Sequence, residues 1–418
     1  MTEAAPLTDE DRAILELESD TIAGHTCKVI VLGAGAPGGD ALRELIAERI
    51  DLVPALTRRL GGTTRAPAWV EDPGFDLADH VVDAQLTRGL DDSGLRDAVA
   101  ELFAQHLDRS RPLWRLDVLP LADGTALVWR IHHAVADGTT TMRFARQLLF
   151  EEETGGGDRP TPASPRPALD DARRRGHLAA FLEREFARSR ETSPFDGLIG
   201  RLRRVGFAVA PLQALHDSAK SLAGATVNDA VLASVAGGLR RWIAEHHGHL
   251  EEMRLKVPVS LHHEGDDAGN RGSFFTVAVP VAEQDAVVRL RAVHEQTAAR
   301  KAAHDAQRID EMTRELRHLS PRLETLWEKV ERSPRRFALN VSNVPGPRSA
   351  VRVLGAPVSR LHTLAEIGEH HALRVSAISY AGAVCFGLCA DPAIVDDLEA
   401  LATGIEAETA EIIAAAVP

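Results

Sequence analysis

The sequence predicts two α/β domains joined by a polar linker. The chain has 418 residues, too many for one ordinary core and suited to two domains of typical size. Helical and strand-like patterns alternate in both halves. Between the halves, the segment 155–167 (GGGDRPTPASPRP) is dense in glycine, proline and serine, which predicts a loop or linker. We therefore expect an N-terminal domain over 1–154, a linker with a helical segment over 155–203 and a C-terminal domain over 204–418.

The first half alternates apolar runs with helical periods. Strand-like runs are predicted at 27–33 (CKVIVLG) and 125–133 (TALVWRIHH), because short apolar runs of this kind are typical of buried strands. Apolar residues recur with a helical period at 39–50, 92–107 and 138–150. This order predicts one α/β domain.

The second half repeats the alternation. A helix is expected to begin near Thr226, which fits a helix N-cap, with Asp229 at the third helical position of a capping box. The remaining predicted elements are strands at 204–212, 253–260, 274–281, 337–342, 373–379 and 383–388, and helices at 285–302 and 392–414.

Composition excludes several classes of partner. The formal net charge of −13 and a pI near 5.8 argue against nucleic acid, whose binding requires a basic surface. The same charge disfavours tight docking on an anionic membrane. We find no apolar run long enough to span a bilayer and no basic leader at the acidic start. We expect a cytoplasmic enzyme, and peripheral contact with a membrane or lipid droplet stays open.

The three cysteines, Cys27, Cys385 and Cys389, lie in apolar sequence without regular spacing. An odd number without a repeated pattern is not a disulfide framework. A metal site would need further cysteine or histidine ligands nearby. Buried thiols are therefore expected.

One of the four adjacent histidine pairs is distinctive. The pair at 132/133 is the only one followed by three residues and then Asp-Gly, and it ends the alternating run 127–131. Neighbouring side chains of a strand face opposite ways, so His133 lies on the side of Leu127, Trp129 and Ile131. His132 lies on the other side, and one imidazole can face a cavity alone.

This pattern suits general-base chemistry. An imidazole has an unperturbed pKa near 6.5, which falls on burial, so it can take a proton from a hydroxyl at neutral pH. Asp137 lies just past the strand-to-loop turn, where its carboxylate can hold the turn in shape. Gly138 supplies backbone freedom beside it.

The histidine pair has other interpretations, each of which requires further residues or a different arrangement. A structural pair of buried histidines stays open on the residues alone. Zinc would need two ligands on one face, which adjacent strand positions do not provide. A serine hydrolase would need Gly-x-Ser-x-Gly, which we do not find, and GAGAPGG at 33–39 lacks the third glycine of a dinucleotide-binding fingerprint. We expect no metal and no cofactor.

Several further blocks carry a resemblance. Beside HHAVADG at 132–138, they are WVEDPGFDLADHV (69–81), LDRSRPLWRLDVL (107–119), GATVNDAVLA (224–233), GNRGSFF (269–275), SNVPGP (342–347) and SYAGAVCFGLCAD (379–391). In this order they resemble the bacterial wax ester synthase/diacylglycerol acyltransferase family of the CoA-dependent acyltransferase superfamily. The resemblance spans nearly the whole chain.

The resemblance implies two chloramphenicol-acetyltransferase-like domains with the active site in a tunnel between them. It implies transfer of a fatty acyl group from acyl-CoA to an alcohol, a diacylglycerol or a long-chain alcohol, without a covalent acyl-enzyme. By the resemblance, His133 is the general base, His132 a supporting residue, and Asp137 with Gly138 the structural end of the motif.

The resemblance also marks residues that shape the active site. They are Asn228, Asp229, Asn270, Ser342, Asn343, Pro345 and Gly346. The first two are equally typical of a helix start, and the SNVPGP segment of a turn between strands.

Two other functions stay open. A condensation-type enzyme also uses His-His-x-x-x-Asp-Gly and would act on a hydroxylated or amino metabolite with a carrier-bound donor. A non-enzymatic relative would keep the fold and bind acyl chains, but intact His133 and Asp137 speak against it.

Overall fold

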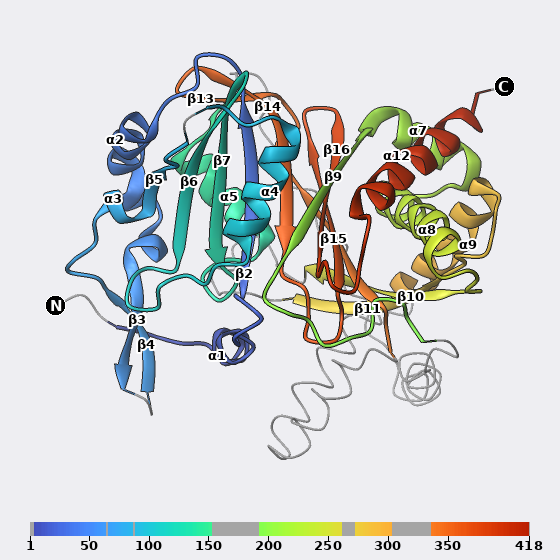
Figure 1. Cartoon of the computed structure of the whole chain (residues 1–418), viewed down its shortest axis with the longest axis horizontal. Coiled ribbons are helices and arrows are strands. Elements are labelled where there is room, and N and C mark those ends of the chain that lie inside the picture. Colours follow the sequence, from blue (N-terminus) through green and yellow to red (C-terminus); the bar gives the residue numbers. More distant parts are fainter. Residues whose placement is uncertain are drawn as a thin grey trace.

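A computed structural model describes residues 4–63, 66–86, 88–152, 192–260, 272–302 and 336–417. The described backbone forms a seven-stranded sheet, a six-stranded sheet and a small three-stranded sheet. The two large sheets lie side by side as two bodies, each with its own helices (Figure 1). This mixed helix and sheet architecture confirms the predicted fold class.

The seven-stranded sheet makes up the first body. In sheet order its strands are β5 (Val81–Asp83), β6 (Trp114–Leu121), β7 (Gly124–His132), β2 (His25–Leu32), β14 (Ala356–Ala365), β13 (Val351–Val353) and β8 (Glu151–Glu152). Its helices are α2 (Gly39–Arg49), α3 (Leu77–His80), α4 (Asp92–Phe103) and α5 (Gly138–Leu148). Strands β6, β7 and β2 pair antiparallel without interruption, and this places the end of β7 beside the start of β2.

The six-stranded sheet makes up the second body. In sheet order its strands are β11 (Gly272–Val279), β10 (Met253–Ser260), β12 (Leu339–Pro345), β15 (Leu373–Tyr380), β16 (Ala383–Ala390) and β9 (Arg204–Pro211). Helices α7 (Leu212–Ala223), α8 (Val227–His246), α9 (Ala286–Ala302) and α12 (Leu398–Ala414) gather on the side away from the first body (Figure 1). The opposite face of this sheet is left to meet the first body.

Smaller elements lie around the start of the chain. They are β1 (Ala5–Pro6), β3 (Arg58–Thr63) and β4 (Ala66–Glu71) of the small sheet, α1 (Asp9–Glu16), and two 3-10 turns at Ile50–Leu52 and Pro54–Thr57. Helix α1 has a capping box in which Thr8 accepts from the Asp11 amide, because its first turn follows the sequence rule for helix starts.

The predicted capping box of α8 is confirmed. The Thr226 side chain accepts from the Asp229 backbone N–H, and the Asp229 carboxylate accepts from the Thr226 N–H at 2.9 Å. The helix predicted at 392–414 begins only at Leu398, because Asp397 caps it by accepting from the Ala400 N–H at 3.0 Å.

The predicted division of the chain needs a correction. Strands β13 and β14 come from the second half of the sequence but belong to the first sheet. The reason is that β14 pairs antiparallel with β2 from Thr26 to Leu32, where β2 would otherwise present unpaired backbone groups. Most of the predicted linker lies outside the described residues, and its described part, 192–203, contains no helix or strand.

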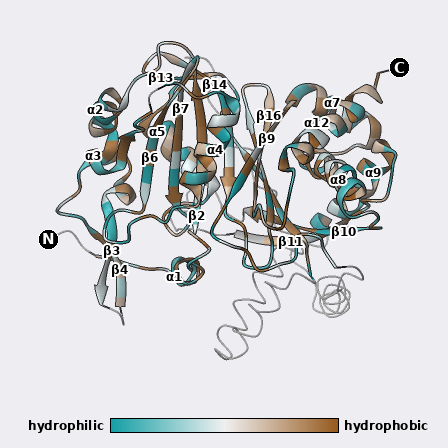
Figure 2. Cartoon of the chain, in the orientation of Figure 1, coloured by the Kyte–Doolittle hydropathy of each residue, from teal (hydrophilic) through white to brown (hydrophobic). Residues whose placement is uncertain are grey.

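The apolar side chains confirm the predicted alternation along β7. Ala126 and Val128 belong to a core cluster shared with the second body. Leu127, Trp129 and Ile131 belong to another cluster, together with residues of α2, α5 and β14. Figure 2 shows the hydrophobic colour concentrated on the strands of both sheets and on one side of the flanking helices.

The single tyrosine of the chain connects β13 and β14 to the second sheet. The Tyr380 hydroxyl donates to the Val358 carbonyl at 2.9 Å and accepts from the Val351 N–H at 3.1 Å. The side chain is only 3% exposed, so water cannot replace either bond.

We predict that Tyr380→Phe lowers the free energy of unfolding by about 1 to 3 kcal/mol, because two buried backbone groups lose their partner. Guanidinium unfolding followed by tryptophan fluorescence measures this. Arg352→Ala, at the exposed residue of β13, is the matched control and should change stability by less than about 0.5 kcal/mol. Equal losses in the two variants would contradict the connecting role of the hydroxyl.

Candidate active site

The turn that follows β7 is held by backbone hydrogen bonds to Leu113, to Gly24 and within the turn itself. The His132 N–H donates to the Leu113 carbonyl at 2.9 Å, and the His133 N–H donates to the Gly24 carbonyl at 2.9 Å. The His132 carbonyl accepts from the N–H groups of Val135 and Ala136 at 2.9 and 3.3 Å. The block 107–119 noted in the sequence therefore fixes the histidine pair through the backbone carbonyl of Leu113.

His132 is buried and structural. Its Nδ1 accepts from the Ala134 N–H at 3.2 Å, and its Nε2 lies 3.5 Å from the Glu18 carboxylate. Arg109 Nε donates to the same carboxylate at 2.8 Å. Burial acts to raise the pKa of Glu18, but the nearby His132 and Arg109 outweigh it and lower that pKa. These contacts fix the His132 ring between the turn and Glu18.

His133 lies on the opposite face and is electrostatically unlike its neighbour. Its side chain is partly exposed, while Nδ1 is buried. Burial and then the nearby Arg374 lower the pKa of His133 to about 4, against the opposing effect of Asp137. At pH 7 the imidazole is therefore neutral and able to accept a proton.

Asp137 holds the turn as the sequence predicts. It is the N-cap of α5 and accepts from the Thr140 N–H at 2.7 Å. Its own carbonyl accepts from the Thr141 hydroxyl at 2.7 Å. The carboxylate thus stabilises the first turn of the helix that follows the histidines.

Lys28 of β2 is a fully buried cation next to this turn. Its Nζ donates to the Thr363 hydroxyl of β14 at 2.7 Å. Burial lowers the pKa of Lys28 to about 8, while Cys27 and Asp137 act in the opposite direction. Lys28 therefore faces the Asp137 carboxylate from the strand next to β7.

Gly138 brings the two bodies into contact. A Cβ at this position would lie 3.0 Å from Val344 Cγ2 of β12 and 3.7 Å from Lys28 Nζ. Only glycine leaves ordinary van der Waals room here. The Asp-Gly end of the histidine motif therefore packs directly on the Asn-Val-Pro block of the second half.

The predicted block at 342–347 forms the end of a strand and not a turn, because β12 pairs parallel with β15 through Pro345. Ser342 Oγ hydrogen-bonds to Ser376 Oγ at 3.1 Å. Asn343 is partly exposed and lies opposite Ala377 in the register. A Cβ at Gly346 would lie 2.3 Å from the Ser379 carbonyl oxygen, so this glycine allows the close approach of β12 and β15.

Asp229 requires a correction as a substrate-binding residue. It is completely buried, and its carboxylate accepts from Thr226 N, Thr297 Oγ1 (2.6 Å) and His294 Nδ1 (2.9 Å). Burial acts to raise its pKa, but these hydrogen bonds lower it overall. The carboxylate thus joins α8 to α9. Asn228 is partly exposed in the first turn of α8, and Asn270 lies outside the described residues.

Sequence reasoning missed Glu18, Lys28 and Arg374. Lys28 and Arg374 each interrupt an otherwise apolar strand, CKVIVL and LRVSAIS. A charged residue within a buried strand is rare unless it has a specific partner, and this was the available signal. Glu18 follows α1 in a polar segment, where nothing in the local pattern distinguishes it.

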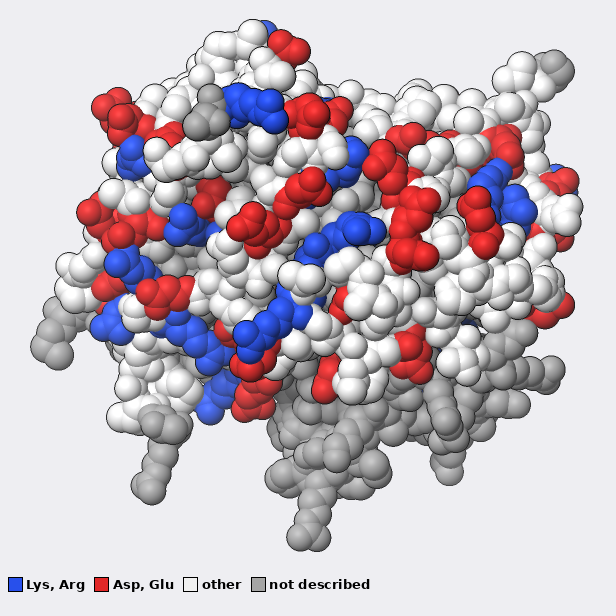
Figure 3. All heavy atoms as spheres, viewed as in Figure 1, with Lys and Arg blue, Asp and Glu red and all other residues white. Residues whose placement is uncertain are grey.

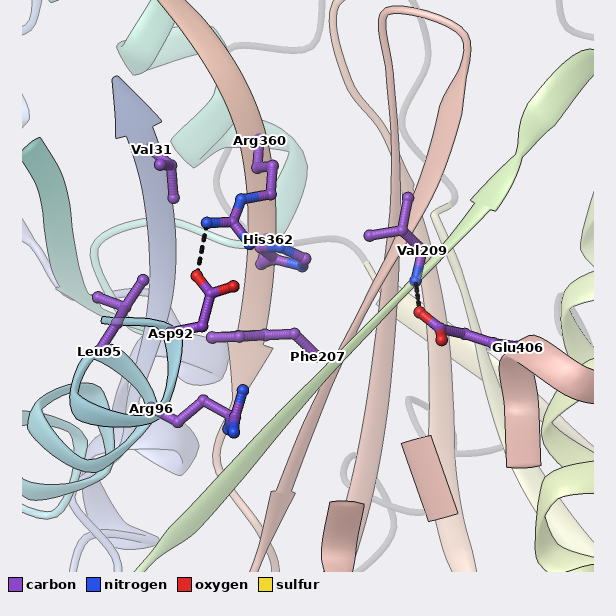
Figure 4. Close-up of a pocket in the computed structure, with 9 residues that line it drawn as sticks. All are labelled: Val31, Asp92, Leu95, Arg96, Phe207, Val209, Arg360, His362 and Glu406. Atoms are coloured by element: carbon purple, nitrogen blue, oxygen red, sulfur yellow. Dashed lines mark hydrogen bonds and ion pairs between the residues drawn. The ribbon is translucent and has the colours of Figure 1, made fainter. Parts of the chain in front are cut away.

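Other possible sites give no support to a different chemistry. Within the described ranges, no group of three His, Cys, Asp or Glu side chains is arranged to hold a metal ion. A cavity of about 160 Å³ lies between α4, β14, β9 and α12, and Figure 4 shows its polar lining. In it Asp92 pairs with Arg360, and none of the predicted site residues contributes to the lining.

Among the described helices, no single one is long and apolar enough to cross a bilayer. Taken together, α7 and α8 have sufficient length and apolar character, but they are bent by 93° where they meet.

Solved structures share this fold. The wax ester synthase/diacylglycerol acyltransferase of Marinobacter aquaeolei VT8 has a TM-score of 0.70 at 23% identity, and 99% of each chain is covered. The first condensation domain of the calcium-dependent antibiotic synthetase has a TM-score of 0.63 at 17% identity, covering 99% of this chain and 97% of the other. These likenesses show that the chain has the two-body fold shared by wax ester synthase/diacylglycerol acyltransferase and condensation-domain structures.

Sequence comparisons identify the family. Residues 7–185 match the wax ester synthase/diacylglycerol acyltransferase catalytic domain, and residues 268–413 match the WS/DGAT C-terminal domain. A putative diacylglycerol O-acyltransferase of Mycobacterium tuberculosis is 31% identical over 98% of this chain and 97% of its own length. A probable diacylglycerol O-acyltransferase of the same organism is 29% identical over 95% and 94%. The chain belongs to the wax ester synthase/diacylglycerol acyltransferase family, which makes it an acyl-CoA-dependent O-acyltransferase.

We predict that Asp137→Ala lowers the free energy of unfolding by about 1 kcal/mol, because α5 loses its N-cap, whereas Asp137→Asn loses only a few tenths. Chemical denaturation of both variants measures the difference. A loss as large in the asparagine variant as in the alanine variant would mean that the charge beside Lys28 matters more than the cap.

Proposed function

We propose that this enzyme transfers a fatty acyl group from acyl-CoA to the hydroxyl of a diacylglycerol or a long-chain alcohol, with His133 as general base. The observation that carries the proposal is the position of His133, whose N–H is held by the Gly24 carbonyl in a turn that packs through Gly138 on Val344 of the second body. Burial lowers the pKa of this imidazole and keeps it neutral. A base at this contact can lie close to both a thioester and a hydroxyl that enter from opposite sides of the contact between the two bodies.

The proposed reaction is a direct transfer. The acceptor hydroxyl gives its proton to His133 while its oxygen attacks the thioester carbonyl carbon, and the carbonyl electron pair moves to the oxygen. Collapse of this intermediate forms the ester, breaks the carbon–sulfur bond and expels the CoA thiolate, which takes the proton back from the imidazolium. No acyl-enzyme forms, and the mechanism requires no metal or cofactor.

The neighbours of His133 have positioning roles in this proposal. His132 and Glu18 set the turn, Asp137 caps the helix that follows it, and Gly138 lets that helix approach Val344. Ser342, Asn343 and Pro345 lie on β12, the strand that faces this helix, and Gly346 directly follows it. Each therefore affects the base through geometry, since a displacement of about 1 Å can cost about 10²-fold in rate.

The charge distribution bears on the partners. Acidic side chains are spread over both bodies in Figure 3, with a band of basic side chains across the middle of that face. With a net charge of −13, we expect no binding to nucleic acid. We further propose a cytoplasmic enzyme whose contact with a membrane or lipid droplet is at most peripheral.

We predict that His133→Ala lowers acceptor-dependent thiol release from palmitoyl-CoA by about 10²-fold to 10⁴-fold, the usual contribution of a general base. The assay compares hexadecanol, a diacylglycerol and short alcohols as acceptors. His216→Ala is the matched control, because His216 is an exposed histidine of α7 that pairs with its neighbour Asp217.

Each result of this assay decides a part of the proposal. Acceptor-dependent release that persists in His133→Ala would remove this histidine from the mechanism. If the wild type releases thiol with none of these acceptors but turns over a carrier-bound donor, the enzyme would be of the condensation type.

A further inference from the structure

Arg374 lies on the wall of the second body that faces the first. Side chains alternate along β15, so Arg374 shares a face with Ile378 and Tyr380. Those two residues pack in the same core cluster as Ala136 of the histidine turn and Met142 of α5. Arg374 therefore lies on the face of β15 that is turned toward the first body.

The contacts of Arg374 leave part of its guanidinium unused. Nη1 donates to the Glu366 backbone carbonyl at 3.0 Å. Nε is buried and makes no hydrogen bond to a described residue, and no carboxylate of the described chain forms an ion pair with Arg374. Burial lowers the pKa of this arginine, but an arginine remains charged at neutral pH.

The nearest carboxylate is already occupied. Glu366 accepts from Arg203 Nε at 2.9 Å, from the Ala23 N–H at 3.1 Å and from the Ile367 N–H at 3.1 Å. The Glu366 carboxylate is thus paired with Arg203, and Arg374, which is partly buried, keeps its positive charge without a described carboxylate partner. A partly buried charge of this kind is costly unless something offsets it.

The same small network also holds the histidine turn. Ala23, bonded to Glu366, precedes Gly24, whose carbonyl accepts from the His133 N–H. Arg374 is accordingly the charged residue with the largest effect on His133, ahead of Asp137 and His132. In the resting enzyme the Arg374 cation opposes protonation of His133. Once His133 has taken a proton, two positive charges lie close together, and a negative charge between them would stabilise both.

We propose that Arg374 is a catalytic residue that stabilises the oxyanion formed when the acceptor hydroxyl attacks the thioester carbonyl. This inference rests on the proposed role of His133 as base. In the tetrahedral intermediate the imidazolium carries one positive charge and the carbonyl oxygen one negative charge. An oxyanion near the unused guanidinium N–H groups offsets both cations in a site of low dielectric.

Two other anions were considered for this position. The phosphates of CoA are separated from the thioester by the pantetheine arm, so they do not reach the arginine nearest the base. A carboxylate on the acceptor would also pair with Arg374, but it would contribute to binding alone and would be specific to anionic acceptors. The two roles therefore differ in the kinetic constant that they affect.

The test measures steady-state kinetics with palmitoyl-CoA for Arg374→Met, Arg374→Lys and the wild type. We expect Arg374→Met to lower kcat about 10²-fold or more, the usual effect of losing an oxyanion donor. The lysine variant keeps the charge and should fall between the two. Exposed Arg352→Met on β13 is the matched control and should retain wild-type kcat.

The pH profile provides a readout that a merely structural role would not change. The charged and titratable groups acting on His133 are Arg374, Asp137 and His132. Removing the Arg374 cation raises the pKa of the base, so more of it is protonated at mildly acidic pH. The acid limb of kcat/KM, expected near pH 4 for the wild type, should therefore move to higher pH in Arg374→Met.

A chemical rescue keeps the test decisive if a variant is poorly folded. Guanidinium ions at millimolar concentration should restore part of kcat in Arg374→Ala, whose thermal unfolding is measured in parallel. Failure of rescue in the folded variant contradicts the proposal. So does an unchanged kcat in Arg374→Met while His133→Ala is inactive, or a loss that appears only in KM for carboxylate-bearing acceptors. Full turnover by His133→Ala would instead overturn the proposed base.

Discussion

The crossing of β14 into the first sheet is the constraint on which the rest of the structure depends. This strand arrives from the second half of the chain, pairs with β2 and packs against β15 and β16. The two sheets are therefore joined through a shared layer of side chains, and Tyr380 connects that layer again from the other side. The histidine turn lies at the end of β7, which pairs with β2, and β2 pairs in turn with β14. Its position therefore depends on both halves of the chain.

This junction contains buried charged side chains. Lys28, Arg203 and Glu366 are all nearly inaccessible, and each has a defined hydrogen-bond partner, because an unpaired buried charge is costly. His133 lies beside these groups, and burial lowers its pKa to about 4, so its imidazole is neutral before substrate arrives. In the proposed mechanism, Arg374 and the imidazolium of His133 are stabilised only when the reaction creates a negative charge on the carbonyl oxygen. The site therefore stabilises the transition state more than the substrates.

Much of this arrangement follows from the sequence. The alternation along β7 correctly separates the faces of His132 and His133, and the rules for helix starts correctly place Thr226 and Asp137 at helix N-termini. The membership of β14 in the first sheet could not be predicted, because strand pairing across more than three hundred residues leaves no local pattern. The family resemblance marked Asp229 as a residue that shapes the active site, and its partners Thr297 and His294 on α9 could not be seen in the local sequence.

Burial at the junction lowers the pKa of His133, so its imidazole is neutral in the resting enzyme. The most direct measurement is an NMR titration of histidines labelled with ¹³C and ¹⁵N, in which the His133 signal is assigned from its loss in His133→Asn. The account predicts a pKa of about 4 for His133 in the resting enzyme. A value near the ordinary 6.5 would mean that the ring is solvated and uncoupled from Arg374, which would contradict the account.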